Sequence, residues 1–220
     1  MGQKVNPRGF RIGVNDLWNT ESQCYGKGFK NQKQIYKKVL PATNFLNKHF
    51  ESKTFIKGNT LSKINDNRWE YNVQYVPLLA KSDCSVPTFK MCDLDLKKYN
   101  ATFWHQNGAL LCGFIKSGLK KGLAFRKIIN TIKILFFNKK KHKIVLKTAR
   151  GIQFYEFTGI KIRYAGRFGG SRSRMSSSIV FRLGAVSLQK LETYIEFFET
   201  PLYTKQGICN LQVWMAYKTI

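Results

Sequence analysis

The feature that most constrains the fold is a change of hydrophobic period within the second half of the chain. Across residues 119–137, apolar residues recur at the period of an α-helix. Residues 160–164, 191–198 and 211–217 instead alternate apolar and polar side chains, as half-buried β-strands do. Turns that contain glycine separate these later segments. The pattern therefore predicts an α+β fold in which one long helix packs across a mostly antiparallel sheet.

The predicted helix at residues 119–137 has an apolar arc and a basic arc. At about 100° per residue, the apolar arc collects Phe125, Ile128, Ile129, Ile132, Leu135 and Phe136. The opposite arc carries Lys120, Arg126, Lys127, Asn130 and Lys133. Leu123 and Ile134 depart from this division. We expect the helix to bury its apolar arc against the sheet and to leave its cations in solvent.

The first half of the chain is less regular. Residues 29–50 predict a basic helix interrupted at Pro41, and residues 54–79 predict strands because Trp69, Tyr71, Val73 and Tyr75 alternate with polar residues. Residues 80–118 carry no period that assigns them a fold. We divide the chain into an extended N-terminal strap at 1–27, a middle region at 28–118 and a C-terminal domain at 119–220.

Charge defines the class of partner. The chain has 38 Lys and Arg against 12 Asp and Glu, a net charge of +26 over 220 residues. Such a charge repels itself in a compact protein, so a permanent polyanion is expected. No run approaches the roughly 18 apolar residues of a membrane-spanning helix, which favours nucleic acid over a membrane. With 43% hydrophobic residues, the chain can also bury a core.

The first thirteen residues mix cations with glycines. Lys4, Arg8 and Arg11 are spaced through a segment that has three glycines and Asn6-Pro7. Proline favours extended geometry before it, and glycine disfavours helix. We expect an extended strap that lies along a polyphosphate partner through these cations. A disordered, solvated tail is the alternative.

Two further segments concentrate positive charge. Arg163, Arg167, Arg172 and Arg174 lie at a predicted strand end and the Gly/Ser loop after it, where guanidinium groups can bind phosphate in bidentate fashion and Gly166, Gly169 and Gly170 admit close approach. A basic run holds Lys139, Lys140, Lys141 and Lys143. Both are predicted contacts to nucleic-acid phosphates, and the alternative is solvated charge.

The sequence does not assemble a catalytic or metal site. The cysteines are Cys24, Cys84, Cys92, Cys112 and Cys209. They contain no C-x-x-C pair and their odd number fits no closed disulfide set, which indicates free thiols in a reducing compartment. A zinc set of Cys84, Cys92, His105 and Cys112 matches no common spacing. Asp93 and Asp95 have no third acid, and there is no phosphate-binding loop. We expect no enzyme, metal or cofactor.

Three motifs occur in the order found in one protein family. They are Met1-Gly-Gln-Lys-Val-Asn-Pro-Arg-Gly-Phe-Arg-Ile-Gly13, the segment 159–170 written Gly-Ile-Lys-Ile-x-x-x-Gly-Arg-x-Gly-Gly, and Asn210-Leu-Gln-Val-Trp-Met215. With Phe125-Arg126-Lys127 on the helix, they make the chain resemble the S-three family of small-subunit ribosomal proteins.

The resemblance implies a structural constituent of the small-subunit head that binds rRNA. The expected rRNA contacts are the cations of the strap, which becomes ordered only against rRNA, and those of the two further basic segments described above. It also implies that basic residues of the long helix line the channel by which mRNA enters. That role falls on Lys120, Lys121, Arg126 and Lys127. Asn130 stands where the family has a further basic residue. The family carries a KH module with a Gly-x-x-Gly loop. No such loop opens a helix in residues 20–118, so we interpret the middle region as a degenerate KH-like region.

The expected partners are small-subunit rRNA, mRNA and neighbouring head proteins of the S-ten and S-fourteen types, without a membrane or a homo-oligomer. Lys, Asn, Ile and Phe are abundant, as in AT-rich genomes, and no Arg-rich amphipathic prefix precedes the first motif. These features favour an organelle-encoded protein of the mitochondrial ribosome, with a plastid or bacterial ribosome as the alternative. The alternative function is a free-standing basic nucleic-acid-binding protein in repair or transcript processing.

Overall fold

The structure, a computed structural model, separates the chain into two compact units. One unit holds Met1–Leu17 with Leu111–Ile220, and the other holds Trp18–Leu110. The first residues thus belong with the C-terminal unit, and the division differs from the boundaries expected after residues 27 and 118. The structure describes residues 4–17, 20–21, 37, 41, 44, 54–65, 68–77, 94–101, 104–105, 107–138, 143–148, 151–168, 175–204 and 206–220.

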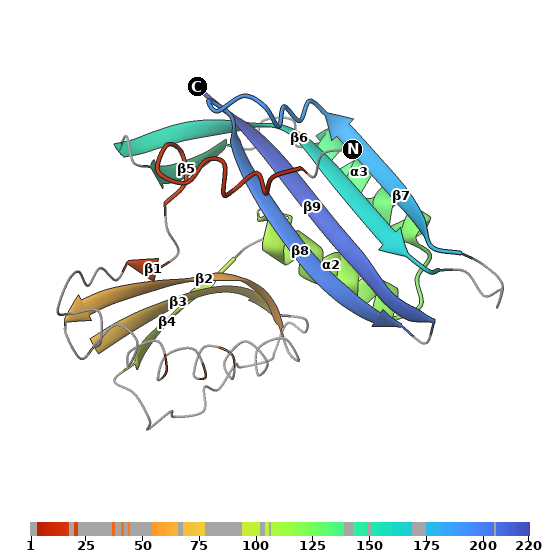
Figure 1. Cartoon of the computed structure of the whole chain (residues 1–220), viewed down its shortest axis with the longest axis horizontal. Helices are drawn as coiled ribbons and strands as arrows, with labels where there is room; N and C mark the ends of the chain where they lie inside the picture. Colours follow the sequence, from red (N-terminus) through yellow and green to blue (C-terminus); the bar gives the residue numbers. More distant parts are fainter. Residues whose placement is uncertain are drawn as a thin grey trace. The chain divides into compact units, whose positions relative to one another are not determined.

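The larger unit contains an antiparallel sheet with helices on one face (Figure 1). Its strands run in the order β5-β6-β9-β8, and β7 also pairs with β6. They are β5 (Lys143–Thr148), β6 (Gly151–Gly166), β7 (Ser177–Gly184), β8 (Tyr194–Thr204) and β9 (Gly207–Thr219). All of the pairings are antiparallel. The predicted α+β class, its mostly antiparallel sheet and the strands at 160–164 and 211–217 are therefore confirmed. The strand expected at 191–198 begins only at Tyr194, since residues 191–193 form a turn before it.

The single predicted helix is wrong at its start, because two helices occupy this region. They are α2 (Gly108–Lys120) and α3 (Phe125–Asn138). Helix α2 ends where Gly122 takes a φ of +79°. The Gly122 N–H donates to the Leu119 carbonyl at 3.0 Å and the Leu123 N–H to the Gly118 carbonyl at 3.1 Å. This pair of bonds is a Schellman motif, which stops a helix at a left-handed glycine.

The core lies between the helices and one face of the sheet. Ile160, Ile162 and Tyr164 of β6 are buried and lie opposite buried residues of β9. From α3, the Phe125 ring lies 5.1 Å from the Tyr164 ring and the Phe136 ring 5.0 Å from the Phe157 ring. The apolar arc of α3 packs on this face as predicted, apart from Leu135, which is half-buried.

The smaller unit is described mainly by a four-stranded sheet in the order β1-β2-β3-β4. Its strands are β1 (Thr20–Glu21), β2 (Thr54–Asn65), β3 (Arg68–Pro77) and β4 (Leu94–Asn100). Strands β2 and β3 are antiparallel, which confirms the strands expected in 54–79, whereas β3 and β4 are parallel. Most of the helix expected at 29–50 lies outside the described residues. Among the described helices, none is long and apolar enough to cross a membrane.

Candidate nucleic-acid interface

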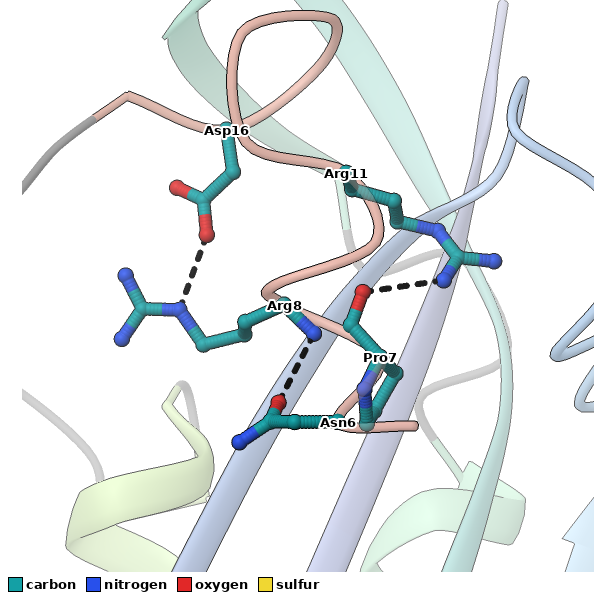
Figure 2. Close-up of polar contacts among 5 residues, drawn as sticks. All are labelled: Asn6, Pro7, Arg8, Arg11 and Asp16. Carbon is teal, nitrogen blue, oxygen red and sulfur yellow. Dashed lines mark hydrogen bonds and ion pairs between the residues drawn. The ribbon is translucent and has the colours of Figure 1, made fainter. Parts of the chain in front are cut away.

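The N-terminal segment, residues 4–17, is folded into successive turns instead of an extended strap. The Phe10 N–H donates to the Asn6 carbonyl at 3.1 Å, and the Ile12 N–H to the Arg8 carbonyl at 3.0 Å. The Asn6 side chain also accepts the Arg8 N–H at 3.0 Å (Figure 2). Asparagine side chains close turns in this way, and Gly13 has a φ of +86°. Gly13 therefore serves a turn, and the extended geometry expected from the sequence is wrong for residues 4–17.

Arg11 is the largest departure from the sequence prediction. It was expected to bind rRNA phosphate, yet it is 0% exposed. Its guanidinium donates to the carbonyls of Pro7 at 3.0 Å, Thr193 at 2.7 Å, Leu188 at 2.9 Å and Lys190 at 2.7 Å (Figure 2 draws the Pro7 bond). Burial lowers its pKa. Because its donors are taken by backbone carbonyls, Arg11 anchors the segment to the loop before β8 and does not face phosphate.

Arg8 is committed in part to the protein. Its Nε lies 2.8 Å from an Asp16 carboxylate oxygen in an ion pair that is partly buried (Figure 2). Burial disfavours its charge, but the hydrogen bond and attraction to Asp16 outweigh burial and leave the pKa raised. Of the three cations predicted in this segment, Lys4 is the exposed one.

The helix corner, defined as Lys120, Lys121, Arg126 and Lys127, lies where α2 ends and α3 begins. All four residues are exposed, so the outward position predicted for Arg126 and Lys127 is confirmed. The Gly122 turn brings the two helix ends together in the chain. The first turn of α3 contains no acidic residue. Since a helix N-terminus favours negative charge, its two cations do not serve the stability of α3.

The arginine-rich segment after residue 159 has mixed surroundings. Arg163 is exposed and Arg167 is half-buried, while Arg172 and Arg174 lie outside the described residues. In the basic run, Lys143 is exposed, and Lys139, Lys140 and Lys141 lie outside the described residues.

Gly166 has a role different from the one predicted. We expected it to admit phosphate, but a Cβ there would lie 2.7 Å from the Cα of Cys209. It also has a φ of +147°. Gly166 therefore serves the packing of β6 against β9.

Two cations that sequence reasoning did not select join Arg163 on the sheet face away from the helices. Lys161 lies two residues before Arg163 in β6 and directly opposite Arg182 of β7. The Lys161 Nζ lies 4.7 Å from the centroid of the Trp214 ring. Burial lowers the pKa of Lys161, as do the charges of Arg182, Lys4 and Arg163. In the sequence, Lys161 alternates with Ile160 and Ile162, and this alternation could have indicated that it lies on the sheet face away from the core.

The two cysteines that the structure describes are buried in the core of the larger unit. Cys112 and Cys209 are free and buried. Burial raises the pKa of Cys112 to about 12. Within the described ranges, no group of three His, Cys, Asp or Glu residues is placed to hold a metal ion. Cys84 and Cys92 lie outside those ranges.

Known proteins resemble the chain over nearly its whole length, although no family model matches it. It is 26% identical to small ribosomal subunit protein uS3m of Chondrus crispus over 99% of this chain and 94% of that protein. It is 24% identical to uS3c of Coffea arabica over 98% of each chain. It is 26% identical to uS3 of Pelagibacter ubique over 98% of this chain and 89% of that protein. The similarity thus includes the middle region, where the sequence motifs are weak.

Proposed function

Because this chain belongs to the uS3 family, the S-three family of small-subunit ribosomal proteins, we propose that it is a structural constituent of the small ribosomal subunit. The observation that carries this function is similarity along nearly the whole chain to uS3 proteins from mitochondria, plastids and bacteria. A net charge of +26 supports a permanent contact with rRNA, since assembly on a polyanion relieves the self-repulsion of the free protein.

Sedimentation tests this assignment. In a native lysate at moderate salt, the protein is expected to travel with small subunits and to be released by high salt or nuclease. A free-standing nucleic-acid-binding protein of repair or transcript processing would instead remain at the top of the gradient or follow other complexes. That distribution would overturn the ribosomal function.

Within the subunit, the helix corner is proposed to contact mRNA as it enters. Its four cations are exposed on one connection between two helices that are themselves anchored in the core. Phosphate near the start of α3 would meet both side-chain charge and the positive end of the helix dipole. Asn130, also exposed on α3, interrupts the basic arc. Any separation of RNA strands here would rest on electrostatic binding, because the sequence has no nucleotide-binding loop.

The double substitution Arg126→Ala and Lys127→Ala tests the helix corner. Subunits that carry it are expected to assemble normally but to translate a message with a stable hairpin several-fold more slowly, and the defect should grow with salt. The matched control replaces two other exposed lysines, Lys190 and Lys218, with alanine. Parental rates in the helix-corner variant would remove the mRNA role and leave the rRNA role standing.

The smaller unit is proposed to be a divergent KH-like module. An antiparallel β2–β3 pair followed by a parallel β3–β4 pair supports this proposal. Because residues 20–118 contain no Gly-x-x-Gly that opens a helix, no RNA clamp is assigned to it. We also propose the mitochondrial ribosome as the location and S-ten and S-fourteen type proteins as neighbours in the head. Fractionation of organelles and cross-linking of purified subunits test these points.

A further inference from the structure

A group of cations lies on the sheet face opposite α2 and α3, away from the helix corner. Lys161 and Arg182 are direct cross-strand partners, and Arg163 follows two residues after Lys161 on the same face. Neighbouring strands are about 4.8 Å apart and residues i and i+2 of one strand about 6.7 Å apart. Three cations are therefore held by the register of β6 and β7 within the span of a few side chains.

This arrangement is unfavourable without an anion. Like charges directly opposite one another destabilise an antiparallel pair. The ammonium group of Lys161 is held over Trp214, with 4.7 Å between Nζ and the ring centroid. In the part of the chain that the structure describes, none of these cations forms an ion pair. Glu199 lies in the same cross-strand row as Arg163, with Gln212 between them, but it accepts a hydrogen bond from Asn210 at 2.5 Å.

Lys4 joins this group from the other end of the sequence. It is exposed and close enough to Lys161 for its charge to lower the pKa of that lysine. Figure 1 shows the N-terminal segment in front of β8 and β9, with the helices behind the sheet. The segment is held there through Arg11, whose guanidinium binds carbonyls of residues 188, 190 and 193. Arg11 thus fixes the place of Lys4 without facing the ligand itself.

We propose that Lys4, Lys161, Arg163 and Arg182, here named the sheet-face cluster, form a second binding site for the phosphates of an RNA backbone, and that Arg11 is its positioning residue. The identification of the polyanion as RNA rests on the proposed function. Two arginine forks and two lysines match successive phosphate oxygens. The site reads no bases, since Trp214 is 8% exposed and is covered by Lys161. It serves to position RNA rather than to select a sequence.

Salt dependence of binding tests the cluster. The full chain is titrated with a 20-nucleotide single-stranded RNA at several salt concentrations, and the slope of log K against log salt is measured. Each phosphate contact contributes about 0.7 to the slope for single strands. The variant Lys161→Gln with Arg182→Gln is therefore expected to lower the slope by about 1.4. The control Lys133→Gln removes an exposed lysine of α3, which lies on the other side of the sheet from the cluster, and should leave the slope nearly unchanged. An equal slope in the double variant and the parent would overturn the site.

The role of Arg11 requires a second comparison. Lys4→Gln and Arg11→Lys are each expected to lower the slope by about 0.7, and the two changes together by no more than either alone. A residue with only a general stabilising role would not show this non-additivity. If Arg11→Lys lowers the slope equally in the parent and in the Lys4→Gln background, the positioning role is wrong. If the protein does not sediment with small subunits but the variants show the expected slopes, the ribosomal function is wrong and the RNA site remains. If it does sediment with small subunits but the slopes do not change, only the RNA site is wrong.

Discussion

Three cations within eight residues of one another have three different surroundings. Lys4 is exposed, Arg8 pairs with Asp16, and Arg11 is fully buried among carbonyl groups. Arginine suits the last environment because its planar group carries five donors in a fixed geometry. The loop at residues 187–193 presents several carbonyls toward one point, and a single guanidinium satisfies them. The type of residue therefore predicts charge, while its partners decide whether the charge reaches a ligand.

Gly184 provides a prediction at a single backbone position. A Cβ there would lie 2.2 Å from the Thr158 carbonyl oxygen, and φ is +74°. Gly184→Ala is expected to lower the free energy of unfolding by about 3 kcal/mol or more, because it adds a backbone clash to an unfavourable conformation. Chemical denaturation measures this loss.

Gly122 supplies the matched control for Gly184. Its φ of +79° is nearly the same, but a Cβ would meet nothing within 4 Å. Gly122→Ala should therefore cost only the left-handed conformation, about 1 to 2 kcal/mol. Equal losses at the two glycines would show that the β6–β7 contact relaxes without cost.

Cys112 should be chemically protected by the fold. Burial raises its pKa to about 12, although a hydrogen bond from Thr200 opposes that rise. The reactive thiolate is therefore scarce in the native protein at pH 8. Iodoacetamide should modify Cys112 more slowly than in the urea-unfolded chain, by on the order of a thousandfold. Mass spectrometry of the Cys112 peptide gives the rate.

The pH profile of Cys112 distinguishes burial of charge from simple shielding. Because the folded pKa lies above the ordinary value of 9.0, the native rate should still rise about tenfold per pH unit near pH 10. A rate that levels off near pH 9 would contradict the raised pKa.

At the level of elements, the helix corner contains the C-terminus of α2 and the N-terminus of α3, two helix ends of opposite polarity that are close in sequence. Lys120 lies in the last turn of α2, where a cation is favourable, whereas Arg126 and Lys127 lie in the first turn of α3, where it is not. Replacing Arg126 and Lys127 with alanine should leave the free energy of unfolding unchanged or raise it by about 0.3 to 1 kcal/mol per charge. Lys120→Ala should lower it by a similar amount.

Thermal or chemical unfolding at low salt checks this difference in sign, and added salt should reduce both effects. A loss of stability in the Arg126 and Lys127 variant would mean that these cations serve the fold. The proposed contact with mRNA would then lose its main structural support.

The elements that were predictable from sequence are those with a clear period. Strands β6, β8 and β9 alternate, and α3 separates its apolar and basic arcs, so local pattern and final burial agree. Helix α2 has no such contrast, since residues 109–115 are apolar on every side and Leu110, Leu111, Cys112 and Ile115 are all buried. A short apolar run does not distinguish a buried helix from a buried strand.

The candidate site was predictable only where local sequence fixes exposure. Arg126 and Lys127 face outward by helical period alone. Arg11, by contrast, binds a carbonyl 182 positions away. The pairing of Lys161 with Arg182 likewise depends on strand register, which the alternation within one strand does not specify. Long-range partners were the missing information.

At the scale of the whole molecule, the larger unit is built from both ends of the sequence. Met1–Leu17 belongs with Leu111–Ile220, while Trp18–Leu110 forms the other unit. During synthesis, the N-terminal segment is made first, but its anchor at residues 187–193 is made nearly last. Because chains fold as they emerge, the segment must wait for the C-terminal sheet. Completion of the larger unit and placement of Lys4 on the sheet face are thereby coupled.

Removal of the N-terminal segment tests this coupling. The sequence alone suggests a strap whose loss leaves the C-terminal domain unaffected. In the structure, deletion of residues 2–16 would remove Arg11 and leave the carbonyls of Leu188, Lys190 and Thr193 without its donors. We expect the free energy of unfolding of the larger unit to fall by about 2 to 4 kcal/mol. Amide hydrogen exchange should increase at residues 187–193.

A shorter deletion separates the anchor from the charge. Removal of residues 2–5 takes away Lys4 but keeps Pro7, Arg11 and Asp16, so stability should change by less than about 0.5 kcal/mol. Both deletions should weaken RNA binding through loss of Lys4, but only the longer one should open the loop before β8. If the two deletions unfold at the same denaturant concentration and exchange alike at residues 187–193, the N-terminal segment is not part of the folded unit, and Arg11 is not its anchor.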